Sequence, residues 1–254
     1  MTEALLELDR VTVSFSGFKA LNELTYKVMP GGLKVLIGPN GSGKSTLLDT
    51  VIGRVRPTAG RVIYKGLNIT NMSEHRIAQL GIRRKFQAPG VLNGLTVQQN
   101  VDVAVRRPKG LIENLKSRLS SQERSKVEEV LSLVNLADKR SLPASQLSHG
   151  EKQWLEIGMV VGCEPDLLLL DEPTSGMTPG ETALTVRLVR LLAERHTVLV
   201  IDHDMSFVEQ LEAPISVLHQ GRLLREGDMQ SIRNDSEVVS VYLGRAVTKT
   251  NAHP

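Results

Sequence analysis

The hydrophobic positions of this chain follow two different periods, which separate strand-forming from helix-forming segments. Over residues 3–29, apolar side chains such as Leu6 and Leu8 mostly alternate with polar ones. This alternation predicts antiparallel strands with one solvated face. A continuous apolar run at 33–37 then predicts a buried strand, and the spacing of apolar residues over 46–52 predicts a helix directly after it.

The pattern becomes helical near residue 88 and stays so to about residue 160. Within this stretch one set of residues follows the i, i+3, i+4, i+7 rule of an amphipathic helix: Val127, Val130, Leu131 and Val134. We therefore expect a helical lobe at about 88–160, inserted into an α/β core formed by about 1–87 and 161–244.

Continuous apolar runs return at Leu167–Leu170 and Thr197–Ile201. Such runs suit strands buried on both faces of a parallel sheet, and strand–helix–strand repetition predicts a doubly wound α/β core. Residues 215–241 predict two short strands, broken at Gln220–Gly221, and a final helix. Residues 245–254 are polar and are expected to form a C-terminal tail.

Composition narrows the possible partners. Aromatic residues make up 3% of the 254, which disfavours a base-stacking platform for single-stranded nucleic acid. Lys and Arg total 31 against 28 Asp and Glu, a formal net charge of +3. We interpret the basic clusters at 83–85 and 106–109 as solvated faces rather than a track for a phosphate backbone, so no nucleic-acid partner is expected.

Location is also constrained by the sequence. Cys163 is the only cysteine, so an internal disulfide is excluded and a reducing compartment is favoured. No apolar run reaches the ~20 residues that a membrane-spanning helix needs. The N-terminus shows no signal-peptide pattern. We expect a protein that is cytosolic or docked from the cytosolic side onto a membrane-embedded partner.

The run Gly38–Ser45 carries the clearest chemistry, because it fits G-x-x-x-x-G-K-[ST] between a predicted strand and a predicted helix. Its glycines allow backbone N–H groups to surround a phosphate at the positive end of a helix. Lys44 is expected to reach the β- and γ-phosphates, and the Ser45 hydroxyl to ligate Mg²⁺. The candidate nucleotide-binding residues are Gly38, Pro39, Asn40, Gly41, Ser42, Gly43, Lys44, Ser45 and Thr46.

Acidic residues and a histidine follow the two later strands. Asp171 is expected to hold Mg²⁺ through its water shell, and Glu172 to orient and polarise the attacking water. His203 comes just after the next strand, at the end where parallel sheets place their ligands. We expect it to contact the γ-phosphate and to hold the water in line.

Ser148 and Glu151 form a capping-box pattern before an apolar helical run. The segment Leu147-Ser148-His149-Gly150-Glu151 also resembles LSGGQ, the signature motif of ATP-binding cassette (ABC) ATPases. Phosphate loop, Gln87, signature, Asp171–Glu172 and His203 occur in the order typical of that family. The resemblance runs from about residue 5 to 244, so we expect one ABC ATPase domain over 1–244.

This resemblance implies a head-to-tail pair of ATPase subunits that encloses two ATP molecules. Ser148 and Gly150 would then contact the ATP held by the other subunit, and Gln87 would lie near Mg²⁺ and the attacking water. Phe15 would stack on adenine, with an ordinary core position as the alternative. The loop Ser175–Thr178 would cross to the other subunit.

Three positions depart from the family pattern. His149 and Glu151 stand where Gly and Gln are usual, and we assign Glu151 to helix capping. Thr178 stands where Asp is usual, which leaves open asymmetric sites with a different partner subunit.

The finer resemblance is to ATP-binding subunits of the urea and branched-chain amino acid importer group, through residues 66–87, 147–159 and 239–244. It implies two membrane permease subunits that the helical lobe contacts at the cytoplasmic face, and indirectly a periplasmic or extracellular solute-binding protein. We expect urea as the solute, with branched-chain amino acids as the alternative.

Two other classes of ABC-type protein fit the sequence less well. A soluble ABC-type ATPase acting on DNA would show sustained heptads, and one acting on ribosomes would join two cassettes; the chain has neither feature. A non-catalytic subunit is disfavoured because Lys44, Asp171, Glu172 and His203 occur together.

Overall fold

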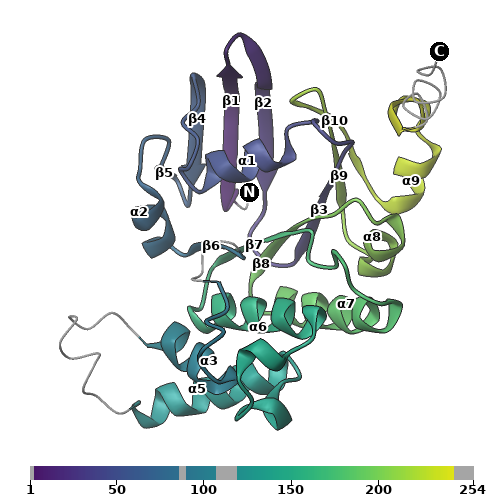
Figure 1. The fold of residues 1–254 in the computed structure, drawn as a ribbon. Coiled ribbons are helices and arrows are strands. Elements are labelled where there is room, and N and C mark those ends of the chain that lie inside the picture. The colour runs from purple at the N-terminus through teal and green to yellow at the C-terminus, as the bar shows by residue number, and fades with distance from the viewer. Residues whose placement is uncertain (1–2, 86–89, 107–118, 243–254) are drawn as a thin grey trace.

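Two β-sheets and a group of helices form the protein, shown in Figure 1. The structure is a computed structural model and describes residues 3–85, 90–106 and 119–242. One sheet has the strand order β2-β1-β4-β5 and the other β10-β9-β3-β8-β7-β6. The predicted α/β class is confirmed: a mainly parallel sheet, an antiparallel β-segment and inserted helices lie together in one chain.

The N-terminal sheet is antiparallel, as the alternating pattern predicted. Its strands are β1 (Leu6–Phe15), β2 (Phe18–Val28), β4 (Ala59–Tyr64) and β5 (Leu67–Asn68). Its inner face packs on helix α1 (Lys44–Val51), whose Leu47, Leu48 and Val51 are fully buried. This packing fixes the start of α1 beside the sheet.

The second sheet is parallel except for its last strand. Its strands are β3 (Leu33–Ile37), β6 (Ile82–Arg84), β7 (Leu167–Asp171), β8 (Thr197–Ile201), β9 (Ile215–His219) and β10 (Arg222–Gly227). Leu167 and Leu169 face the core around α1, whereas Leu168 and Leu170 face the opposite core. Strand β7 is therefore buried on both faces, as its continuous apolar run predicted.

The first of the remaining helices packs through Ile77 into the core around α1, and the others pack into the opposite core of the parallel sheet, as Figure 1 shows. They are α2 (Glu74–Gln79), α3 (Val97–Val105), α5 (Ser121–Leu133), α6 (His149–Gly162), α7 (Pro179–Ala193), α8 (Met205–Leu211) and α9 (Met229–Asn234), with 3₁₀ turns η1 (Ala137–Lys139) and η2 (Ala144–Gln146). Residues 236–242 form a further helical segment, so the described chain ends in two short helices where one was predicted. The predicted tail, 245–254, lies outside the described residues.

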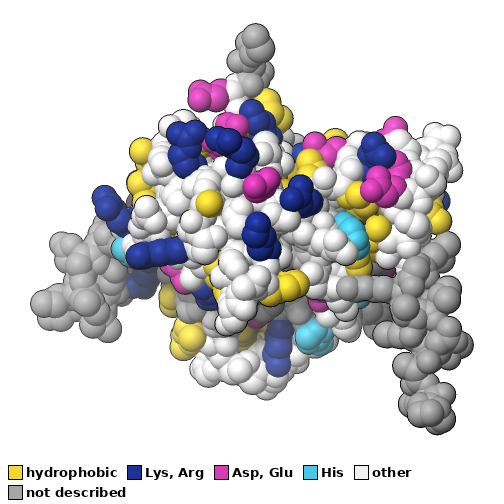
Figure 2. Space-filling view, turned by 90° about the horizontal axis from the view of Figure 1, so that it is seen from above, with side chains coloured by type: hydrophobic (Ala, Val, Ile, Leu, Met, Phe, Trp, Pro, Cys, Tyr) yellow, Lys and Arg dark blue, Asp and Glu magenta, His cyan; other side chains and the backbone are white. Residues whose placement is uncertain are grey.

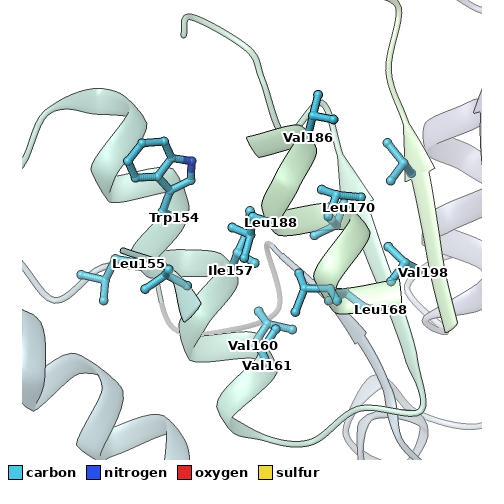
Figure 3. Close-up of a cluster of buried hydrophobic side chains, with 14 of the residues drawn as sticks. Trp154, Leu155, Ile157, Val160, Val161, Leu168, Leu170, Val186, Leu188 and Val198 are labelled. Carbon is cyan, nitrogen blue, oxygen red and sulfur yellow. The ribbon is translucent and has the colours of Figure 1, made fainter. Parts of the chain in front are cut away.

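Helices α6 and α7 share one core with strands of the parallel sheet, and Figure 3 shows this core. Its Leu155 and Ile157 are fully buried, in the same core as Leu168 of β7. The Trp154 indole N–H donates to Oγ1 of Thr185 on α7 at 2.9 Å. The buried indole N–H of Trp154 therefore has a hydrogen-bond partner, and the bond joins α6, which carries the predicted signature, to α7, which follows Asp171–Glu172.

The interpretation of the basic cluster at 83–85 as a solvated face is wrong for two of its residues. Arg84 is 6% exposed and Lys85 is 2% exposed. Strand β6, which the sequence pattern did not predict, carries Arg84 to the buried side of the sheet beside β7. Burial lowers the pKa of Lys85, although nearby carboxylates including Glu156 oppose the shift.

On the face of the molecule drawn in Figure 2, Lys and Arg side chains are interspersed with acidic and hydrophobic ones.

Candidate functional site

The phosphate loop connects β3 to α1, as predicted, and is held closely against the N-terminal sheet. Gly43 precedes α1 with a φ of 108°, and a Cβ at this position would lie 2.5 Å from the Ala20 carbonyl oxygen. Only glycine fits there. The Ser42 carbonyl accepts a hydrogen bond from Gly221 at 2.8 Å, so the loop is fixed from a second side.

Lys44 lies inside this loop. Its side chain is buried, and its Nζ donates to the carbonyl oxygens of Gly38 at 2.7 Å and Pro39 at 3.2 Å. The Ser42 hydroxyl is buried and has no hydrogen-bond partner within the described part of the chain. A loop that holds an ammonium group and an unsatisfied hydroxyl fits the phosphate oxygens of a nucleotide.

The other predicted catalytic residues lie at the same edge of the sheet. Strand β8 lies between β3 and β7, with Ile201 paired to Leu36 on one side and to Asp171 on the other. Because these strands are parallel, their carboxyl ends meet where such sheets bind ligands. The phosphate loop, Asp171–Glu172 and His203 all follow these three strand ends.

Glu172 and His203 are in contact. Nδ1 of His203 lies 3.2 Å from Oε1 of Glu172. Glu172 has a left-handed backbone with φ 44°, an uncommon conformation that is typical of constrained sites. Asp202 is 2% exposed; one oxygen accepts the His203 backbone N–H at 2.7 Å and the other accepts the Thr174 hydroxyl at 2.9 Å. Asp202, which was not among the predicted site residues, thus holds the segment that carries His203.

The predicted Mg²⁺ ligands are Ser45, Asp171 and Gln87; the first two offer a hydroxyl and a carboxylate, and Gln87 lies outside the described residues. Mg²⁺ usually takes one or two protein carboxylates and completes its shell with phosphates and water, so this small donor set fits it. Oδ2 of Asp171 accepts a 2.6 Å hydrogen bond from Arg84, whose other nitrogen donates to Asp49 at the same distance. Local sequence patterns did not predict a role for Arg84 or Asp49 at this site, because their contacts join distant parts of the chain.

Ser148 caps α6 through the predicted capping box. Its Oγ accepts the Glu151 backbone N–H at 3.2 Å, and Glu151 accepts the Ser148 N–H at 3.0 Å. These reciprocal bonds confirm the assignment of Glu151 to capping, and Lys139 also pairs with this carboxylate. The Ser148 hydroxyl donates to Glu181 at 3.3 Å. Among the described residues, neither Ser148 nor Gly150 has a hydrogen bond to the phosphate loop of its own chain.

Thr178 and His149, which also depart from the family pattern, make hydrogen bonds within the chain. Thr178 caps α7, accepting the Glu181 N–H at 3.3 Å while Glu181 accepts the Thr178 N–H at 2.9 Å. The T-x-x-E pattern was visible in the sequence and could have predicted this cap. His149 Nε2 lies 3.0 Å from the Ser175 carbonyl oxygen, so it ties the start of α6 to the loop before α7.

Phe15 and Gln87 complete the predicted set. Phe15 is 50% exposed, so its alternative interpretation as a core residue is wrong. It pairs across the β1–β2 hairpin with Phe18, which is 66% exposed. Gln87 lies outside the described residues.

Sequence comparison agrees with this geometry. The family described as ABC transporter matches residues 21–175. The chain belongs to this family. The ABC protein is 31% identical over 255 residues to the high-affinity branched-chain amino acid transport ATP-binding protein LivG of Escherichia coli K12, covering 97% of this chain and 100% of LivG. It is 33% identical to BraF of Pseudomonas aeruginosa PAO1, with the same coverage.

Structure comparison gives the same family. The ADP conformation of an ATP-binding cassette from an ABC transporter matches with a TM-score of 0.81 at 29% identity, over 96% of this chain and 100% of that one. The ABC protein is therefore an ATPase, and its suspected family and its fold are confirmed. No helix in the ranges that the structure describes is long and apolar enough to cross a membrane.

Proposed function

We propose that this chain is the ATP-hydrolysing subunit of an ABC importer and that it drives uptake of branched-chain amino acids. The observation that carries the proposal is the meeting of the phosphate loop, Asp171, Glu172 and His203 at one edge of the sheet. The names of LivG and BraF, which match this chain along its whole length, support branched-chain amino acids better than urea as the solute.

Hydrolysis uses residues that are already close to one another. Lys44 binds the β- and γ-phosphates in place of the loop carbonyls that it now contacts. Ser45 and Asp171 hold Mg²⁺, which neutralises phosphate charge when bound. Glu172 accepts a proton from the attacking water, and His203 orients the Glu172 carboxylate through their 3.2 Å contact.

A second ATPase subunit completes the site. Ser148, as N-cap, and Gly150, in the first turn, lie at the N-terminal end of α6, where the helix dipole favours an anion. We infer that this end binds the γ-phosphate held by the second subunit. Phe15 stacks on adenine, which its exposed ring allows. Gln87 acts beside Mg²⁺, as the family resemblance implies.

The helical lobe at about 88–160 transmits closure of the ATP sites to two permease subunits at the cytoplasmic face of the membrane. Three large apolar side chains of this lobe are exposed: Leu92, Val103 and Leu142. In this scheme these side chains belong to the surface that contacts the permease subunits. In this scheme a rigid-body movement of the lobe changes the membrane partners, and a solute-binding protein acts only through them.

Affinity purification of the chain from gently solubilised membranes tests the proposal. We expect two permease subunits and a second ABC ATPase, or a second copy of this chain, to be recovered with it. A Lys27→Ala variant is a matched surface control and should recover the same proteins. Recovery of DNA, ribosomes or soluble proteins alone would contradict the importer function while leaving the ATPase activity in place.

A further inference from the structure

Arg84 joins two parts of the site that are far apart in the sequence. Its side chain is 7% exposed and lies at the end of β6. Nη1 donates to Oδ1 of Asp49 at 2.6 Å, and Nη2 donates to Oδ2 of Asp171 at 2.6 Å. A planar guanidinium can bind two carboxylates from two nitrogens at once, and this geometry uses that capacity.

The two carboxylates belong to the elements that carry the proposed Mg²⁺ ligands. Asp49 lies four residues after Ser45 on α1, and residues with this spacing lie on the same side of a helix. Asp171 ends β7. Arg84 therefore fixes α1 to β7 about one helical turn from Ser45.

We propose that Arg84 is a positioning residue for Mg²⁺, which it does not touch. In the described part of the chain, Asp171 has one side-chain hydrogen bond, from Arg84 to Oδ2. Oδ1 would then be the oxygen that Asp171 offers to the water shell of a bound Mg²⁺. This inference rests on the proposed Mg²⁺ site, and groups that orient a metal ligand strongly affect metal affinity.

A lysine at position 84 separates the effect of the positive charge from the effect of the guanidinium geometry. Arg84 places one positive charge between the carboxylates of Asp49 and Asp171. Lysine has the same charge but a single nitrogen, which cannot serve both carboxylates in the same fork. Arg84→Lys should therefore keep the charge balance and lose the fixed orientation of Asp171.

Arg54 provides a matched control. Its Nη1 lies 3.9 Å from the same Oδ1 of Asp49, but the side chain is 51% exposed, and within the described residues it makes no ion pair with Asp171. Arg54→Lys therefore makes the same chemical change next to the same carboxylate, without the contact to Asp171.

The test is binding of a fluorescent ATP analogue to the purified full chain, titrated with Mg²⁺ and repeated in EDTA. For Arg84→Lys we expect the Mg²⁺ concentration at half-maximal binding to rise about tenfold or more. The affinity in EDTA should stay close to that of the unmodified chain. Arg54→Lys should leave both values unchanged.

The outcomes distinguish failure of the positioning role of Arg84 from failure of the proposed Mg²⁺ site. If binding to the unmodified chain does not depend on Mg²⁺, the proposed metal site is wrong. If it does depend on Mg²⁺ and Arg84→Lys behaves like the unmodified chain, the positioning role is overturned. If Arg84→Lys does not fold, Asp49→Asn decides: a shift in the same direction supports the role, and an unchanged Mg²⁺ dependence overturns it.

Discussion

Nδ1 of His203 lies 3.2 Å from Oε1 of Glu172. The two residues follow neighbouring parallel strands, β8 and β7, so the register of the sheet brings them together. Their side chains are 63% and 45% exposed, which leaves the carboxylate open to water. This contact gives Glu172 the orientation that a general base needs.

Replacing the proposed base should separate ATP binding from hydrolysis. We expect Glu172→Gln to bind ATP normally and to lose about 100-fold or more in kcat, because the amide cannot accept the proton of the attacking water. Glu212→Gln, at an exposed position, is the control. Steady-state ATPase rates and ATP affinities of both variants check this, and hydrolysis near the normal rate in Glu172→Gln would remove Glu172 as the base.

Replacing the loop lysine should instead weaken binding. Lys44→Ala removes a buried ammonium from the phosphate loop, so we expect ATP affinity to fall about 10- to 100-fold, the effect of losing a charge-assisted hydrogen bond. Equilibrium binding of ATP measures this, with Lys27→Ala as the exposed lysine control. Unchanged affinity in Lys44→Ala would show that this loop does not hold the nucleotide.

The lowered pKa of Glu151 predicts that the stability of the fold depends on pH. Burial raises its pKa, but hydrogen bonds from Lys139 and the Ser148 backbone outweigh this and leave the pKa below the ordinary 4.5. A lowered carboxyl pKa stabilises the fold above pH 4.5, and this contribution is lost as pH falls through the folded-state pKa.

Glu151→Gln keeps a capping-box residue but removes the charge that pairs with Lys139. We expect a loss of about 1 kcal/mol in the free energy of unfolding at pH 7, and a smaller loss as the pH falls below 4.5. Urea unfolding at pH 7 and pH 3.5 measures the difference. An equal loss at both pH values would show that the charge of Glu151 does not stabilise the fold.

Much of the fold could be predicted because local patterns determine it. The loop Gly38–Ser45 has its own backbone requirement for glycine, and the continuous run Leu167–Leu170 reports burial on both faces of β7. Capping at Ser148 follows from four consecutive residues. In each case a pattern within one short segment is enough for the prediction, although the contacts around Gly43 and β7 come from other parts of the chain.

The prediction failed where long-range contacts decide. Arg84 in a basic cluster looks like a surface residue, and only the distant carboxylates of Asp49 and Asp171 make its burial favourable. The role of Asp202 likewise depends on Thr174, 28 residues earlier. Such partners are set by the topology of the sheet and are not visible in local periodicity.

The composite site can be tested by mixing subunits. Ser148→Arg should block the signature end of one chain, and Lys44→Ala should disable the phosphate loop of the other. A dimer of the two variants keeps one intact site if each ATP lies between a phosphate loop and the partner's signature helix. We expect the mixture to hydrolyse ATP faster than either variant alone; a rate equal to theirs would count against head-to-tail pairing, provided that the two chains associate.

The most direct test of the whole account is uptake of radiolabelled leucine and urea by source cells that lack this chain. We predict that leucine uptake is lost, returns with the unmodified chain and does not return with Glu172→Gln, while urea uptake is unaffected throughout. Loss of urea uptake alone would keep the importer mechanism and change the solute. Normal uptake of both solutes without the chain would contradict the proposal that it drives their import.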